Sequence, residues 1–154
     1  MSFEEKIKDV LVGKICESSV DKNQLWIRVL PSDIAPVLKD LRDNPEFSFD
    51  FLTDICGVDN FPSKRRFEVV YHLLSTKNKF RLRIKVQVPE DTMMVPSSVS
   101  VWKGANWMER EVYDMYGIKF EGHPDLRRIL MHEDFKDFPQ RKDFPLKGWR
   151  HEAD

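Results

Sequence analysis

One segment of this 154-residue chain alternates without error between apolar and polar residues, and it constrains the fold more than any other feature. Across 81–88 every even position holds leucine, isoleucine or valine, whereas arginine, lysine or glutamine holds every odd one. A period of two is typical of a β-strand with one buried and one polar face. The segment 67–74 is rich in β-forming residues and precedes it across the loop 75–79. Together they predict the central antiparallel hairpin of a sheet.

Weaker signals surround this hairpin. The other predicted elements are a helix at 3–12, strands at 14–20 and 25–30, a helix from 32 or 33 to about 42, and a strand that begins with Phe47, Phe49 and Phe51 and ends near Gly57. Short loops join most of the strands, whereas parallel neighbours need crossovers of about a dozen residues. The chain is therefore predicted to be an α+β protein, with a mainly antiparallel sheet, helices packed on one face, and an extended C-terminal arm. The predicted division is an α+β domain at 1–117 and the arm at 118–154.

Charge and cysteine content exclude several classes of function. The chain has 25 Lys+Arg and 26 Asp+Glu, so it lacks the basic excess of a nucleic-acid-binding protein. No apolar run reaches the roughly 18 residues of a membrane helix, so no direct span is expected. Cys16 and Cys56 are far apart, and His123 and His132 have no metal-ligand spacing. No metal site is therefore predicted in this chain.

The segment 106–117 carries a dense set of charged residues. They are Glu109, Arg110, Glu111 and Asp114. Asn106 at its start and a glycine at its end predict a short helix, in which Glu109 is placed to cap the first turn. Arg110 and Asp114 are four residues apart and are predicted to pair. Helix chemistry alone leaves three roles open for the acids: capping and surface pairing, a protein interface, or catalysis.

The sequence after this helix has no regular period but keeps aromatic and basic residues. The aromatic residues are Phe135, Phe138, Phe144 and Trp149, and the candidate binding residues are His123, Arg127, Arg128, Arg141 and Lys142. Its prolines block regular sheet pairing, while disordered tails are poor in aromatic residues. We therefore expect a loosely held arm that buries its aromatic residues mainly against a partner and binds carboxylates through its basic residues. The alternative is an arm that folds back on its own domain.

A family resemblance connects these motifs. The signature of the family is present as Glu109-Arg110-Glu111, Asp114, Met115-Tyr116, His123 and Arg127, and the phrases at 105–107, 116–118, 122–130 and 141–146 also match. On these residues the chain resembles the 30 kDa-type subunit, or C-subunit, of the proton-pumping NADH:quinone oxidoreductase, respiratory complex I. The likeness is strong over 96–149 and weaker but collinear from 49 to 88. The stretch 137–140 departs from the turn that the family often has there.

The resemblance implies a subunit of an oxidoreductase that has no catalytic residue and no redox cofactor of its own. It would be a structural subunit of the peripheral arm, supporting electron transfer from NADH to quinone coupled to proton translocation. Flavin and iron–sulfur clusters are implied in partner subunits. The implied partners are the large quinone-cavity subunit and the adjacent cluster-bearing subunit, on the cytoplasmic side of the bacterial inner membrane.

The resemblance also implies a use for the charged residues. The expected partner interface consists of Glu109, Arg110, Glu111, Asp114, His123, Arg127, Arg128, Arg141 and Lys142. Two alternatives remain at this point. One is the homologous subunit of a membrane-bound, energy-converting hydrogenase. The other is a free-standing metal or phosphate enzyme that uses Glu109, Glu111, Asp114 and His123.

Overall fold

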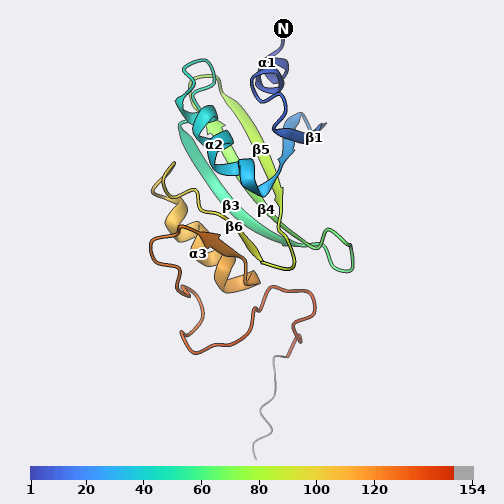
Figure 1. The fold of residues 1–154 in the computed structure, drawn as a ribbon, viewed down its shortest axis with the longest axis vertical. Coiled ribbons are helices and arrows are strands. Elements are labelled where there is room, and N and C mark those ends of the chain that lie inside the picture. Colours follow the sequence, from blue (N-terminus) through green and yellow to red (C-terminus); the bar gives the residue numbers. More distant parts are fainter. Residues whose placement is uncertain (148–154) are drawn as a thin grey trace, which may run out of the picture.

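The structure is a computed structural model that describes residues 1–147. Trp149, predicted as an aromatic anchor of the arm, lies outside the described residues. The elements are α1 (Phe3–Val10), β1 (Ile15–Asp21), β2 (Gln24–Val29), the short 3₁₀ helix η1 (Pro31–Asp33), α2 (Ile34–Asp43), β3 (Phe51–Asp59), β4 (Phe67–Ser75), β5 (Phe80–Gln87), β6 (Met94–Pro96), α3 (Ala105–Tyr116) and β7 (Lys119–Glu121). Strands β1 to β5 form one sheet in the order β1-β2-β5-β4-β3 (Figure 1).

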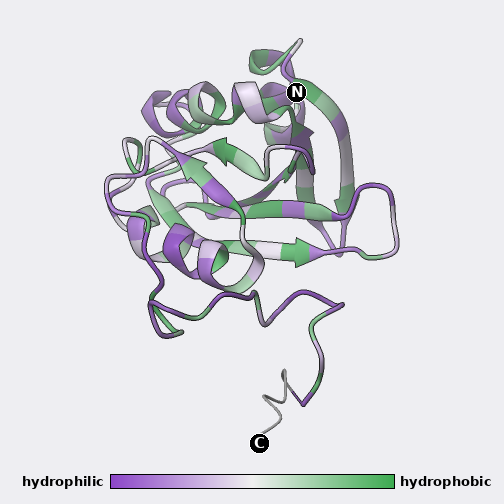
Figure 2. Ribbon diagram, turned by 60° about the horizontal axis from the view of Figure 1, so that its bottom comes forward, coloured by the Kyte–Doolittle hydropathy of each residue, from purple (hydrophilic) through white to green (hydrophobic). Residues whose placement is uncertain are grey.

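The predicted hairpin is confirmed and lies inside this sheet. Strands β4 and β5 pair antiparallel, with Tyr71 opposite Ile84 and Leu73 opposite Leu82. These four side chains are essentially inaccessible to solvent. Figure 2 shows the alternation as green and purple bands along the strands. Because one residue of slippage would turn every side chain to the opposite face, the buried leucine, isoleucine and valine residues also fix the register.

One pairing in the sheet is parallel, between β2 and β5. Leu25 lies opposite Leu82, and Ile27 lies opposite Ile84. The chain between these two strands contains α2, β3 and β4. It is therefore longer than the crossover of about a dozen residues that parallel neighbours need. The other pairings of the five strands are antiparallel, so the prediction of a mainly antiparallel sheet is confirmed.

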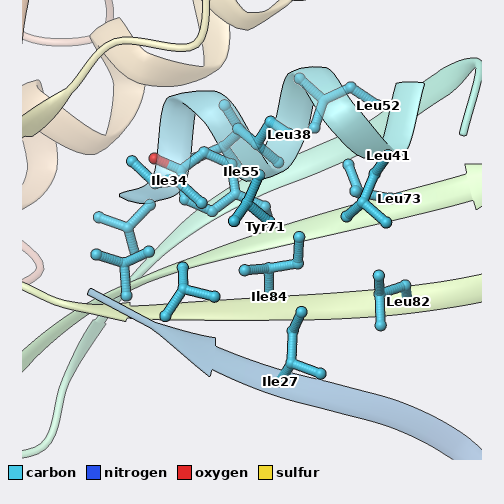
Figure 3. Packing of buried hydrophobic residues seen from close by; sticks show 14 of the residues in the cluster. Ile27, Ile34, Leu38, Leu41, Leu52, Ile55, Tyr71, Leu73, Leu82 and Ile84 are labelled. Atoms are coloured by element: carbon cyan, nitrogen blue, oxygen red, sulfur yellow. The ribbon is translucent and has the colours of Figure 1, made fainter. Parts of the chain in front are cut away.

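The main core lies between the sheet and the helices on one of its faces. Figure 3 shows Ile34, Leu38 and Leu41 of α2 above Tyr71 and Ile84 of the sheet, and all five are fully buried. The spacing of the α2 residues places them along one side of that helix. Among residues 1–147 no helix is long and apolar enough to cross a membrane.

The expected strand start at Phe47 is wrong. Phe47 and Phe49 are fully buried, but they belong to a loop, and β3 begins only at Phe51. Ser48 between them has a positive φ of 45°, which is incompatible with an extended strand. The alternation arises because this bend turns both phenylalanines to the core. Phe51 itself is 53% exposed.

The predicted boundary after residue 117 does not coincide with the end of the packed structure. Strand β7 pairs in parallel with β6, and Val95 lies opposite Phe120. Ile118 and Phe120 are both buried in the core. The extended part therefore starts at Gly122, and we call residues 122–147 the C-terminal segment. In Figure 1 it runs as an orange to red chain around α3.

Candidate functional site: a helix that anchors the C-terminal segment

Helix α3 lies close to the edge strand β3 because a glycine allows it. A Cβ atom at Gly57 would lie 2.4 Å from Cδ2 of Tyr116, a distance that real structures do not tolerate. The helix then ends at Gly117, whose φ of 77° is left-handed, as the sequence predicts. A Cβ there would also lie 2.7 Å from the ring of Phe138. Two glycines thus bring the helix, the sheet and the C-terminal segment into contact.

Glu109 does not cap the helix, contrary to the prediction. Helix α3 begins after Gly104, and no side chain caps it. The Glu109 carboxylate is fully buried and accepts hydrogen bonds from Ser97 Oγ at 2.7 Å, from the Ser98 amide at 2.6 Å and from Ser98 Oγ at 2.7 Å. Burial raises the pKa of Glu109, and the bonds from the serines oppose that shift. The residue ties α3 to the loop that leads into it.

Asp114 is the anchor of the C-terminal segment. It is fully buried, and its Oδ2 accepts the backbone amides of Ile129, Leu130 and Met131 at 3.0, 2.7 and 2.9 Å. Its Oδ1 accepts from Arg128 Nη1 at 2.8 Å. Burial would raise the pKa of this carboxyl, but the Met131 amide, Arg128 and the other two amides outweigh it and hold the pKa below its usual value. The carboxylate is therefore ionised and fully bonded at neutral pH.

The predicted pair of Arg110 with Asp114 is not formed. Arg110 donates instead to the carbonyl oxygens of Arg127 and Arg128, at 3.1 and 2.9 Å. Arg128 takes the place at Asp114, and its Nη2 also donates to the carbonyl of Asp137 at 2.9 Å. The reason is that the returning chain offers bare carbonyl groups beside the helix, and a guanidinium with several donors satisfies them.

The aromatic and basic residues of the segment also pack within the chain. Arg128 is 8% exposed, and its guanidinium lies over the rings of Phe135 and Phe138 at 5.4 and 5.1 Å. Arg141 donates to the carbonyl of Tyr116 at 2.8 Å and also lies over Phe138, at 4.6 Å. Burial lowers the pKa of Arg141. These residues therefore contact their own domain, as in the alternative of an arm that folds back, while Phe135, Phe138 and Phe144 stay half-buried and leave ring surface for a partner.

A second anchor, Asp59 at the end of β3, was missed by sequence reasoning. Its carboxylate accepts two hydrogen bonds from Arg66 at 3.0 Å each and the backbone amide of Lys142 at 2.8 Å. Arg66 also pairs with Asp143 at 2.9 Å. Burial opposes ionisation, but Arg66 and then the amides of Lys142 and Phe61 dominate and lower the pKa of Asp59 to about 2. An aspartate that ends a strand gives no signal in the sequence of a contact 83 residues away.

Two of the predicted interface residues lie at the surface and bond locally. Arg127 is 61% exposed and pairs with its near neighbour Asp125 at 2.7 Å. The His123 ring accepts the Asp125 amide at Nδ1, so Nε2 carries the proton and donates to the Asn106 carbonyl at 3.1 Å. Both residues shape the turn where the segment leaves β7.

Among the charged residues of the signature, Glu111 is the one whose side chain forms no hydrogen bond or ion pair within residues 1–147. It is exposed at the rim of a hollow of about 250 Å³ between β3 and α3, which Asp54, Cys56 and Tyr116 also line. Burial, and then the adjacent Asp54, raise the pKa of the Cys56 thiol to about 12. The thiol is therefore protonated at neutral pH, and the hollow offers no nucleophile. Within residues 1–147 no three His, Cys, Asp or Glu side chains gather as a metal site would need.

The fold and the site define a class of protein: a small α+β scaffold that holds an extended segment along one helix through buried carboxylates. Solved structures share this fold. The chain is 32% identical to a trypsin-resistant fragment (1–134) of Nqo5, with a TM-score of 0.69, covering 82% of this chain and 100% of that one. It is 27% identical to a chain of the membrane-bound sulfane sulfur reductase, an archaeal respiratory membrane complex, with a TM-score of 0.78, covering 93% of this chain and 85% of that one.

Sequence comparison gives the family. The model described as "Respiratory-chain NADH dehydrogenase, 30 Kd subunit" matches residues 27–150, so the chain belongs to that family. It is 57% identical over 122 residues to the NADH-quinone oxidoreductase C-subunit 2 of Rhizobium meliloti (strain 1021), covering 79% of this chain and 66% of the relative. It is 47% identical over 148 residues to the NADH-quinone oxidoreductase C-subunit of Methylobacterium sp. (strain 4-46), covering 96% and 68%. The chain thus spans about two thirds of the length of these relatives.

Proposed function

We propose that this chain is a non-redox structural subunit of the peripheral arm of an NADH:quinone oxidoreductase. The observation that carries the proposal is its 57% identity to a relative named as C-subunit 2 of that enzyme. In this role it supports electron transfer from NADH to quinone, coupled to proton translocation, without a catalytic residue of its own. The flavin and the iron–sulfur clusters belong to partner subunits.

The geometry of the site supports a scaffold more than a catalyst. Glu109 and Asp114, the buried acids of the family signature, are occupied by hydrogen bonds from this chain. Groups so fully bonded are not available to bind substrate, but they hold a surface in a fixed shape. Pre-ordering a surface lowers the entropy that is lost when it binds a partner.

The anchored segment displays residues suited to protein contact. Leu130, beside the amides held by Asp114, is 62% exposed, and so is Trp107 on α3. Glu111, Arg127 and Lys142 are exposed as well and add charged groups to the surface of α3 and the C-terminal segment. Large apolar side chains with a charged rim are typical of a protein interface. We expect the large quinone-cavity subunit, and after it the adjacent cluster-bearing subunit, to cover this surface.

Purification of the native complex tests the proposal. The chain carries a C-terminal tag, membranes are solubilised in a mild detergent, and the co-purified proteins are identified by mass spectrometry. The proposal expects the flavin-bearing, cluster-bearing and quinone-cavity subunits, together with NADH:quinone reductase activity. Association with the cytoplasmic face is tested by protease digestion of inside-out and right-side-out vesicles.

Two outcomes contradict the proposal. Recovery of the chain alone excludes a subunit role. Recovery with a nickel-binding large subunit indicates the related hydrogenase complex instead. The relatives' names favour the quinone reductase over this second possibility.

A further inference from the structure

The face of the sheet that points away from α2 carries an unusual set of side chains. Strand residues that lie opposite each other share a face, and Trp26 lies opposite Arg83, which lies opposite His72. Lys85 lies opposite Val70 in the next row. We call this surface, with Arg81 at its end, the outer face. It includes Trp26, Val70, His72, Arg81, Arg83 and Lys85, and Arg28 also belongs to it because it lies opposite Lys85.

The outer face has a row of positive charge that the described part of the chain neutralises only in part. Arg81, Arg83 and Lys85 alternate along β5, so their side chains leave the strand about 7 Å apart. Within residues 1–147 the carboxylate found within 4 Å of this row is Asp21, 3.6 Å from Arg83. Cations so placed repel one another, and an external anion would relieve that repulsion.

A neighbouring arginine shows what a neutralised cation looks like on the same sheet. Arg28 on β2 forms an ion pair with Glu68 at 2.6 Å and a second one with Glu17. Arg83, by contrast, has one acid near its guanidinium, Asp21 at 3.6 Å, which is too far for a hydrogen bond. The Arg83 side chain is 22% exposed, so its guanidinium is suited to a hydrogen-bonded carboxylate from outside the chain.

The outer face also offers apolar area for contact. The ammonium of Lys85 lies 4.2 Å from the centre of the Trp26 ring, and the tryptophan is half-buried, so part of it remains open to contact. Tryptophan and arginine are the residues most often found at the energetic centres of protein interfaces. The surface therefore combines discrete cations with an aromatic anchor.

We propose that the outer face binds an acidic segment of another subunit of the complex, whose carboxylates pair with Arg81, Arg83 and Lys85. The inference rests on the proposed function. A protein fits better than a nucleic acid or an anionic membrane because acids border the cations. Glu17 and Asp21 on one side and Asp54 on the other would repel a continuous run of phosphates, whereas separate carboxylates can be placed between them.

Chemical footprinting of Lys85 tests this. The purified chain and the tagged complex are acetylated with the same amine reagent, and the rate at each lysine is followed by mass spectrometry. The proposal expects Lys85 to react about tenfold more slowly in the complex, with Lys39 on the exposed side of α2 as the reference. A zero-length carbodiimide should join Lys85 to an aspartate or glutamate of another subunit.

Charge reversal provides a second test. The double variant Arg81→Glu/Lys85→Glu changes two residues that have no ion pair in the described chain, and Lys8→Glu/Lys39→Glu makes the same charge change on the helices. Circular dichroism first establishes that both variants fold. The proposal expects the first variant to be recovered in the complex about tenfold less than the second.

The outcomes separate this inference from the proposed function. If the chain co-purifies with the complex while Lys85 reacts equally in both states, the outer face is not an interface and the function stands. Protection that disappears after nuclease or delipidation also overturns the inference. If the chain is recovered without the complex, both fail together.

Discussion

Replacing Asp114 by asparagine should release the C-terminal segment. The carboxylate is fully buried and accepts three backbone amides as well as Arg128. An asparagine side chain has one oxygen and one NH2 group. In either orientation its NH2 group faces other donors, which are Arg128 in one case and the three backbone amides in the other. Arg128 would then be a buried cation without its anion. Breaking a buried pair in this way costs about 3–5 kcal/mol.

Hydrogen exchange measures this effect where it occurs. In the native chain we expect slow exchange at Ile129, Leu130 and Met131, and in Asp114→Asn an increase of roughly 100-fold or more, which corresponds to about 3 kcal/mol. Arg127→Ala is the matched control, because Arg127 is exposed and pairs only with exposed acids, so it should change stability by about 0.5 kcal/mol or less. Unchanged exchange at the three amides in the asparagine variant would refute the anchoring role of Asp114.

Three further predictions follow from burial and charge. Ile84→Ala removes a fully buried side chain at the centre of the sheet and should lower the free energy of unfolding in urea by about 2–5 kcal/mol, and a loss below about 1 kcal/mol would contradict the packing. Because the pKa of Asp59 is lowered to about 2, its contribution is complete above about pH 4 and is lost as the pH falls toward 2. A pH series on Asp59→Asn should therefore show a smaller loss of stability over that range than the native chain, in which Asp114 and Asp59 both contribute, and the same loss in both proteins would show that Arg66 does not bind Asp59. Glu111→Lys should leave the thermal stability of the isolated chain nearly unchanged but reduce its recovery in the complex, whereas full recovery would remove Glu111 from the interface.

The sequence predicts the helix of the site, but it does not predict which residues the charged side chains of that helix bind. Residue spacing alone predicts a helix over 106–117 that closes at its glycine, and the structure has it at Ala105–Tyr116, because periodicity and the closing glycine act within one or two turns. The predicted N-terminal caps are not formed. Residue spacing does not predict the partner of each charged residue. Asp114 has Arg110 at a favourable helical spacing, yet it binds Arg128 and three amides instead. A buried carboxylate is stabilised most by the donors that burial brings to it, and those come from a segment outside the helix.

The hairpin and the α+β class were determined by the sequence itself. An unbroken period of two across 81–88 has one physical meaning, and strands joined by short loops restrict the possible topologies. The tertiary structure decided everything that depends on distant contacts. It made β2 and β5 parallel, placed Ile118 and Phe120 in the core, and joined Asp59 to a backbone amide 83 residues later. Such contacts leave no periodic trace, because the partner of a buried charge is selected by the packing of the whole chain.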